Sequence, residues 1–236
     1  MSMSLPVYLA LTGAEFPHRS ANCQNFAYMA CHFSPYGTGL SNLPRELPAG
    51  CLLILNDRIP VFFHDPKRIC QELCQIVEKL GCEGILLDFQ RPGDKRTQEI
   101  ARAVVDALPC PVAVTECYAR ELSCPVFLCP PLYITPEESI AKWPGREIWL
   151  ELGLWSQVLT LTEDGCTIGP VLPIEDRSDF FLSQELCCGY RVEVWEEKAE
   201  FTLQRRLDDI QILLNRLCDS QVTRAVGLYQ ELGEQW

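Results

Sequence analysis

The sequence predicts an α/β fold of the TIM-like (β/α)8 barrel class, with an incomplete helix ring and inserted β-hairpins. Eight short apolar runs have the length of buried strands, and helical patterns separate several of them. The run from Ile85 to Leu87 is apolar throughout, as in a parallel strand buried on both faces, and it delivers Asp88, Phe89 and Gln90 at its carboxyl end. A smaller doubly wound α/β sheet, with the hairpins as a subdomain, is the alternative.

The first three predicted strands precede any strong helix signal. They cover Val7 to Gly13, Phe26 to Phe33 and Cys51 to Leu55. Residues 35–50 are rich in Pro, Gly, Ser and Asn and show no helical period, which predicts a long loop. No helix is therefore expected between the second and third strands.

Two helices flank the fourth strand, the one that ends in Asp88. Asp65-Pro66 predicts the start of the first, because aspartate caps helix N-termini and proline is favoured at the first helical position. Apolar residues then recur at helical spacing until Gly81, which ends the helix. The second helix is predicted over Lys95 to Leu108.

Three further strands follow, with a short helix from Thr135-Pro136 between the last two. They cover Pro111 to Thr115, Val126 to Cys129 and Glu147 to Leu152. The chain then departs from this alternation, because apolar runs flank turn signals at residues 163–165 and 196–198, and each pair of runs predicts a hairpin.

A last helix, Arg205 to Leu217, and an eighth strand, Ala225 to Leu228, complete the pattern. Too few residues remain for a helix after that strand. We therefore predict a single barrel domain over residues 1–236, with a hairpin-rich insertion at about 156–204.

Composition narrows the class of protein. With 236 residues, 47% of them apolar, the chain can bury a sizeable core, and it contains no apolar run long enough to span a membrane. The N-terminus lacks the basic region of a signal peptide. The 14 cysteines lie within apolar patterns and form no C-x-x-C pair, so we predict reduced cysteines in a cytoplasmic protein. A net charge of −12 argues against nucleic-acid and membrane partners.

In a barrel the carboxyl ends of the strands converge on one mouth. The candidate site residues there are Asp57, Asp88, Gln90, Glu116, Tyr118, Tyr133, Glu151, Tyr229 and Glu231. Aromatic rings stack on pyranose faces and carboxylates bind sugar hydroxyls, so this mixture predicts a saccharide-like ligand. Paired carboxylates are also the working groups of glycoside hydrolysis. Strand-end acids equally cap helices or pair with arginines.

No cofactor or metal is predicted. The sequence has no G-x-G-x-x-G, Walker, G-x-S-x-G or H-E-x-x-H motif. The histidines His18, His32 and His64 would meet only if all lay at the strand-end face, and surface positions or positions with satisfied hydrogen bonds are favoured for them.

Residues 83–90 resemble the fourth-strand signature of family 18 glycoside hydrolases, Asp-Gly-x-Asp-x-Asp-x-Glu with an aromatic before the last residue. Gly84, Asp88 and Phe89 match the glycine, the third aspartate and the aromatic. The departures are Glu83 and Leu86 at the first two aspartates and Gln90 at the terminal glutamate.

In that family the glutamate protonates the leaving oxygen and the neighbouring aspartate orients the substrate acetamido group. A carboxamide cannot act as a general acid near neutral pH, so by this route the protein is not a chitinase. The resemblance implies that Gln90 can still hydrogen-bond a sugar oxygen and that Asp88 can still hold an amide N–H.

Three functions stay open at this point. The first is a saccharide-binding barrel that has lost the family's acid. The second is an active hydrolase that pairs Asp88 with an acid on another strand, for example Glu116, Glu151 or Glu231. The third is an interaction or structural protein whose hairpins and bare outer strands form a contact, such as a homo-oligomer interface.

Overall fold

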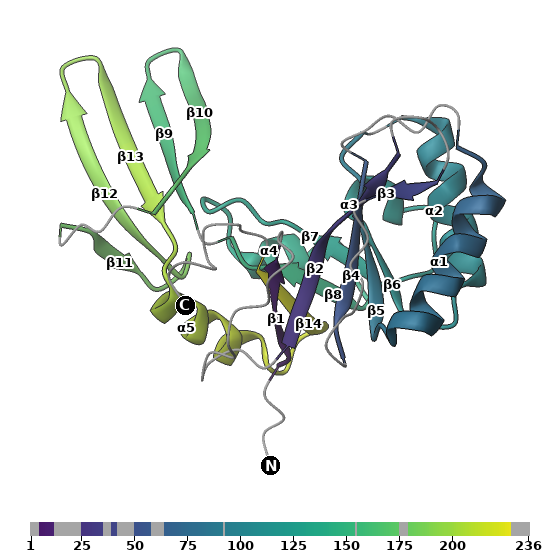
Figure 1. Ribbon diagram of the computed structural model, residues 1–236. Coiled ribbons are helices and arrows are strands. Elements are labelled where there is room, and N and C mark those ends of the chain that lie inside the picture. Colours follow the sequence, from purple (N-terminus) through teal and green to yellow (C-terminus); the bar gives the residue numbers. More distant parts are fainter. Residues whose placement is uncertain are drawn as a thin grey trace.

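The computed structural model describes residues 5–11, 25–34, 39–41, 50–57, 64–91, 93–153, 155–174 and 179–227. Its first sheet contains eight parallel strands (Figure 1). They are β1 (Val7–Leu11), β2 (Asn25–Phe33), β4 (Leu52–Asn56), β5 (Gly84–Asp88), β6 (Val112–Thr115), β7 (Val126–Leu128), β8 (Ile148–Glu151) and β14 (Val222–Gly227). A two-residue strand, β3 (Leu40–Ser41), pairs antiparallel with the end of β2.

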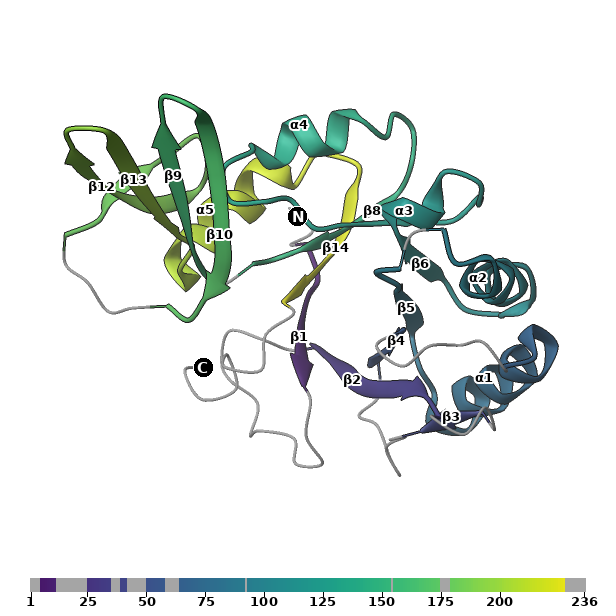
Figure 2. The same ribbon diagram turned by 90° about the horizontal axis from the view of Figure 1, so that it is seen from above.

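The eight parallel strands close into a barrel. They pair in the order β1-β2-β4-β5-β6-β7-β8-β14, and β14 pairs in turn with β1. Figure 2 shows this ring from above. The predicted (β/α)8 class is therefore confirmed. The doubly wound alternative is wrong, because an open sheet would leave two parallel strands without a second neighbour.

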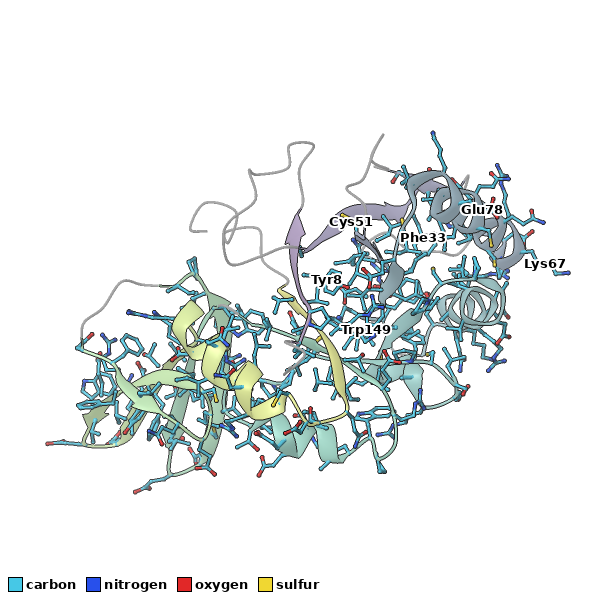
Figure 3. The ribbon with its side chains drawn as sticks, turned by 90° about the horizontal axis from the view of Figure 1, so that it is seen from below. Tyr8, Phe33, Cys51, Lys67, Glu78 and Trp149 are labelled. Atoms are coloured by element: carbon cyan, nitrogen blue, oxygen red, sulfur yellow. The ribbon has the colours of Figure 1, made fainter. Side chains whose placement is uncertain are left out.

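Alternate residues of the strands fill the barrel interior, as the two-residue period of a strand requires. The interior cluster consists of Tyr8, Ala10, Leu52, Ile54, Leu86, Ala113, Phe127, Trp149 and Val226. Tyr8 and Trp149 lie within the ring, whereas Lys67 and Glu78 of the outer helix point to solvent (Figure 3). A Cβ on Gly84 would come within 2.9 Å of the Trp149 ring, so this position needs glycine.

Two long helices cover the outer face of β4, β5 and β6. Helix α1 (Pro66–Leu80) begins at Asp65, whose carboxylate accepts the Lys67 N–H, and ends at Gly81, which has a φ of +65°. Helix α2 (Lys95–Ala107) is capped by Asp94. Both predicted helices are confirmed. Together with the strands they bury the largest apolar layer of the described residues.

The remaining helices are short or lie late in the chain. They are α3 (Glu116–Ala119), which was not predicted, α4 (Pro136–Ala141) and α5 (Leu207–Leu217). Helices α4 and α5 cover β7, β8 and β14. The segments on which a helix after β1 or β14 would fall lie outside the described residues. No described helix combines the length and apolarity needed to cross a bilayer.

A second, five-stranded antiparallel sheet separates β8 from α5. Its strands are β9 (Ser156–Thr162), β10 (Gly165–Leu172), β11 (Phe181–Ser183), β12 (Cys188–Trp195) and β13 (Lys198–Gln204). They pair in the order β10-β9-β13-β12-β11, so both predicted hairpins are confirmed and β11 is an addition. In Figure 1 the two hairpins stand away from the barrel.

One face of this second sheet is apolar, since the paired residues Val192, Phe201 and Leu159 share it. Near the barrel this face is covered by Trp155 and Leu132. Further out it is open, with Val194 74% and Phe181 68% exposed. The predicted homo-oligomer remains a prediction.

The eighth barrel strand begins earlier than predicted. Strand β14 begins at Val222 rather than Ala225, because the polar pair Thr223 and Arg224 interrupts the apolar run without ending the strand. The twelve cysteines whose side chains the structure describes are free thiols, in agreement with the predicted reduced state.

Candidate functional site

The carboxyl end of β5 presents an aspartate and a glutamine that are hydrogen-bonded to each other. Gln90 Nε2 donates to Asp88 Oδ1 at 2.5 Å. Asp88 is half-buried and Gln90 is exposed, while Leu86, two residues before Asp88 on the interior face of β5, is fully buried. The family-like motif therefore ends in a polar pair above an apolar barrel interior.

Asp57 fixes the backbone of this pair. Its carboxylate is 3% exposed and accepts the backbone N–H groups of Gln90 at 2.9 Å and of Arg91 at 3.1 Å. Both oxygens are thus engaged by the chain itself. These hydrogen bonds give Asp57 a positioning role, and the ligand contact predicted for it remains a prediction.

Removal of this carboxylate should loosen the segment after β5. In Asp57→Ala the two amide donors lose their acceptors, and we expect unfolding to become easier by about 1–2 kcal/mol, because water can reach part of this segment. Asp57→Asn is the matched control, since it keeps one acceptor and should lose about half as much. Urea denaturation measures both variants, and an unchanged midpoint for Asp57→Ala would contradict this role.

Tyr118 and Thr115 hold the same segment from the other side. The Tyr118 hydroxyl donates to the Arg91 carbonyl oxygen, and Thr115 Oγ1 donates to the Phe89 carbonyl oxygen at 2.5 Å. The Tyr118 ring packs edge-on against Phe89, and burial raises the pKa of its hydroxyl to about 12. Tyr118 lies in the layer between the barrel and α2, and the ligand contact predicted for it remains a prediction.

Glu151 and Cys129 form the second polar group at the strand ends. Glu151 ends β8 and is 8% exposed, and its carboxyl group interacts with the thiol of Cys129, which follows β7. Burial raises the pKa of Glu151 to about 7, and the charge of Asp88 contributes to this rise. Asp88, Cys129 and Glu151 are therefore close enough to act on one another.

Cys129 is solvent-accessible, yet protein surrounds it closely enough that burial raises the pKa of its thiol well above the usual range. The charges of Glu151 and Asp88 raise that pKa further. Cys129 was not among the predicted site residues. The signal that could have found it was its place at the end of the sixth predicted strand.

The other candidates lie at the rim or outside the described residues. Glu116 begins α3, is exposed, and its charge also acts on Cys129. Tyr133 is half-buried against the cluster that contains Trp155, where the second sheet joins the barrel. Tyr229 and Glu231 fall outside the described residues. Trp155 was missed, although an aromatic residue soon after Glu151 was visible in the sequence.

Glu83, at the position of the family's first aspartate, lies at the opposite end of the barrel from Gln90. Its carboxylate accepts the Tyr8 hydroxyl at 2.9 Å and pairs with Arg224 at 3.0 Å. The Arg224 guanidinium lies 4.7 Å from the centre of the Trp149 ring. This network closes the amino end of the barrel, so Glu83 is structural.

The described residues contain no group of His, Cys, Asp and Glu side chains suited to a metal ion. His64 is buried, with Nε2 3.2 Å from the Gly39 carbonyl oxygen and its ring against Phe33. His18 and the side chain of His32 lie outside the part of the chain that the structure describes.

No family model matches the sequence. No curated protein matches it either. Solved structures do match. A family 18 N-acetylglucosaminidase from Paenibacillus barengoltzii superposes with a TM-score of 0.64 over 95% of this chain and 94% of that one, at 10% identity.

The protein has the fold of family 18 glycoside hydrolases. The spore cortex-lytic enzyme SleL of Bacillus cereus gives a TM-score of 0.60 at 13% identity, over 98% of this chain and 72% of that one. A family 18 chitinase mutant of Cycas revoluta, in complex with (GlcNAc)4, gives a TM-score of 0.60 at 10% identity, over 97% of this chain and 95% of that one. The resemblance first seen in residues 83–90 therefore extends to the fold of the whole chain.

A hollow of about 850 Å³ lies elsewhere, between the tips of the two hairpins. Acidic side chains of residues 163–164 and 196–197 line it, and Lys198 Nζ lies 4.5 Å from the centre of the Trp195 ring. The acidic residues are exposed and solvated, unlike the partly desolvated polar groups at the strand ends. The strand ends are therefore the candidate site.

Proposed function

We propose that the protein binds an N-acetylated saccharide at the carboxyl ends of the barrel strands. The observation that carries the proposal is the Asp88–Gln90 pair, held at the end of the fourth barrel strand by Asp57, Thr115 and Tyr118. A preorganised polar pair needs little ordering when a ligand binds, which favours affinity.

Each member of the pair offers a different contact to a sugar. The Asp88 carboxylate can accept an acetamido N–H, and the Gln90 amide can bind a hydroxyl or ring oxygen. Tyr133 provides an aromatic surface at the rim. The Cycas revoluta structure supports this reading, because one of its two substitutions puts glutamine in place of a glutamate and it holds the GlcNAc tetramer.

Calorimetric titration with the GlcNAc tetramer tests the proposal. The wild-type protein should bind it, and Asp88→Ala should weaken binding about tenfold or more, since hydrogen bonds to a charged group contribute about 1.5–3 kcal/mol. Asp164→Ala, on the exposed turn between β9 and β10, removes the same charge as a control and should bind normally.

Two results would contradict the proposed saccharide binding. One is the absence of heat with the GlcNAc monomer, dimer and tetramer at millimolar concentration. The other is equal affinity in the wild-type protein and Asp88→Ala.

A further inference from the structure

We propose that Glu151 is the proton donor of this site and that, with Asp88, it hydrolyses the glycosidic bond of the bound saccharide. This rests on the proposed saccharide binding and adds turnover to it. The acid would then come from the seventh barrel strand instead of the fourth, where Gln90 has no proton to give.

Both carboxyl groups lie on the interior face of the barrel, at the carboxyl ends of their strands. Glu151 follows Trp149 by two residues on β8, and Asp88 follows Leu86 by two residues on β5, so each continues the interior face of its strand. Cys129 follows β7, the strand next to β8, and its thiol interacts with Glu151. Asp88, Cys129 and Glu151 therefore lie at the carboxyl ends of β5, β7 and β8, close enough for their charges to act on one another.

The surroundings of Glu151 suit a group that alternates between acid and carboxylate. Burial and the charge of Asp88 raise its pKa, which keeps the proton in place near neutrality. The Cys129 thiol and the charge of Arg205, a residue only 1% exposed, lower that pKa and so stabilise the carboxylate left after proton transfer. Asp88 remains more accessible to solvent than Glu151.

The reaction balances with water as the only co-reactant. Glu151 gives its proton to the glycosidic oxygen as the bond from that oxygen to the anomeric carbon breaks. A water oxygen bonds to the anomeric carbon, and the Asp88 carboxylate takes the proton that this water loses. The two sugar products leave, and one proton passes from Asp88 to Glu151 through solvent, which restores the starting state.

The test follows hydrolysis of the GlcNAc tetramer and of a 4-nitrophenyl N-acetylglucosaminide by new reducing ends and released nitrophenolate. Glu151→Gln should lose about 10²–10⁴-fold in rate on the tetramer while still binding it. The loss on the nitrophenyl glycoside should be much smaller, because that leaving group departs without a proton. Glu163→Gln, on the exposed β9–β10 turn, should keep the wild-type rate on both.

The pH profile gives a readout that a structural role would not move. Wild-type activity should fall above about pH 7, where Glu151 loses its proton. Cys129→Ala removes the thiol whose interaction lowers the pKa of Glu151, so the alkaline limb of the pH profile should move to higher pH. If Glu151→Gln does not fold, the pH profile of Cys129→Ala still tests the role of Glu151 as proton donor.

The possible failures are distinguishable. If the wild-type protein binds the tetramer but never cleaves either substrate, Glu151 is no catalyst and the binding function stands. If it does not bind, both proposals fall. Full tetramer activity in Glu151→Gln, or an alkaline limb that does not move in Cys129→Ala, would overturn the inference alone.

Discussion

Trp149→Ala should lower the free energy of unfolding by about 3–5 kcal/mol, because it opens a large cavity in the centre of the barrel. The side chain is fully buried and packs within the interior cluster with Tyr8 and Phe127. Its Nε1 also donates to Glu147 Oε1 at 3.1 Å, and Arg224 stacks on its ring. The substitution removes all of these contacts at once.

Guanidinium denaturation measures this effect, with Trp195→Ala as the matched control. Trp195 is 44% exposed on β12, so its removal should change the free energy of unfolding by only about 1 kcal/mol or less. Trp149→Phe keeps a ring inside the barrel and should fall between the two. Equal midpoints for Trp149→Ala and Trp195→Ala would contradict the assignment of Trp149 to the barrel centre.

Stability should decrease as the pH rises from about 4.5 to about 7, through the titration of Glu151. The pKa of this carboxyl is 4.5 when unperturbed and about 7 in the folded protein. Between these values the folded state binds more protons than the unfolded state, so raising the pH favours unfolding. At 1.36 kcal/mol per pKa unit, the free energy of unfolding should be about 3 kcal/mol lower above pH 7 than below pH 4.5 through this group alone.

The difference between Glu151→Gln and the wild-type protein isolates this contribution from the other carboxyl groups. Near pH 4.5 the two should have similar free energies of unfolding, whereas above pH 7 the variant should be more stable by up to about 3 kcal/mol. Glu163→Gln, on an exposed turn, should follow the wild-type profile. A constant difference between Glu151→Gln and wild type at every pH would show that Glu151 is not buried as described.

The barrel was predictable because its local signals agree with its tertiary structure. Asp65-Pro66 and Gly81 mark the ends of α1, and the buried strands read as uninterrupted apolar runs because both of their faces are covered. The four residues of α3 gave no signal, since a single helical turn has no period to detect.

The candidate site was predictable only in part. The placement of Asp88 and Gln90 followed from their position after a buried run. The engagement of Asp57 with two backbone amides did not, because the strand's alternation ends at Asn56 and the direction of the next side chain depends on the segment it meets. The raised pKa of Glu151 comes from burial and from the charge of Asp88 on β5, and the sequence alone shows neither the burial nor the proximity of the two carboxyl groups.

The most direct measurement of the central claim is a crystal structure of Glu151→Gln grown with the GlcNAc tetramer, a variant in which bound sugar should survive. We predict sugar density at the carboxyl ends of the strands, with one acetamido or hydroxyl group within hydrogen-bond distance of Asp88 and another of Gln90. Sugar bound only at the hairpin tips, or a strand-end site without sugar at saturating tetramer, would contradict the claim that this barrel mouth is a saccharide site.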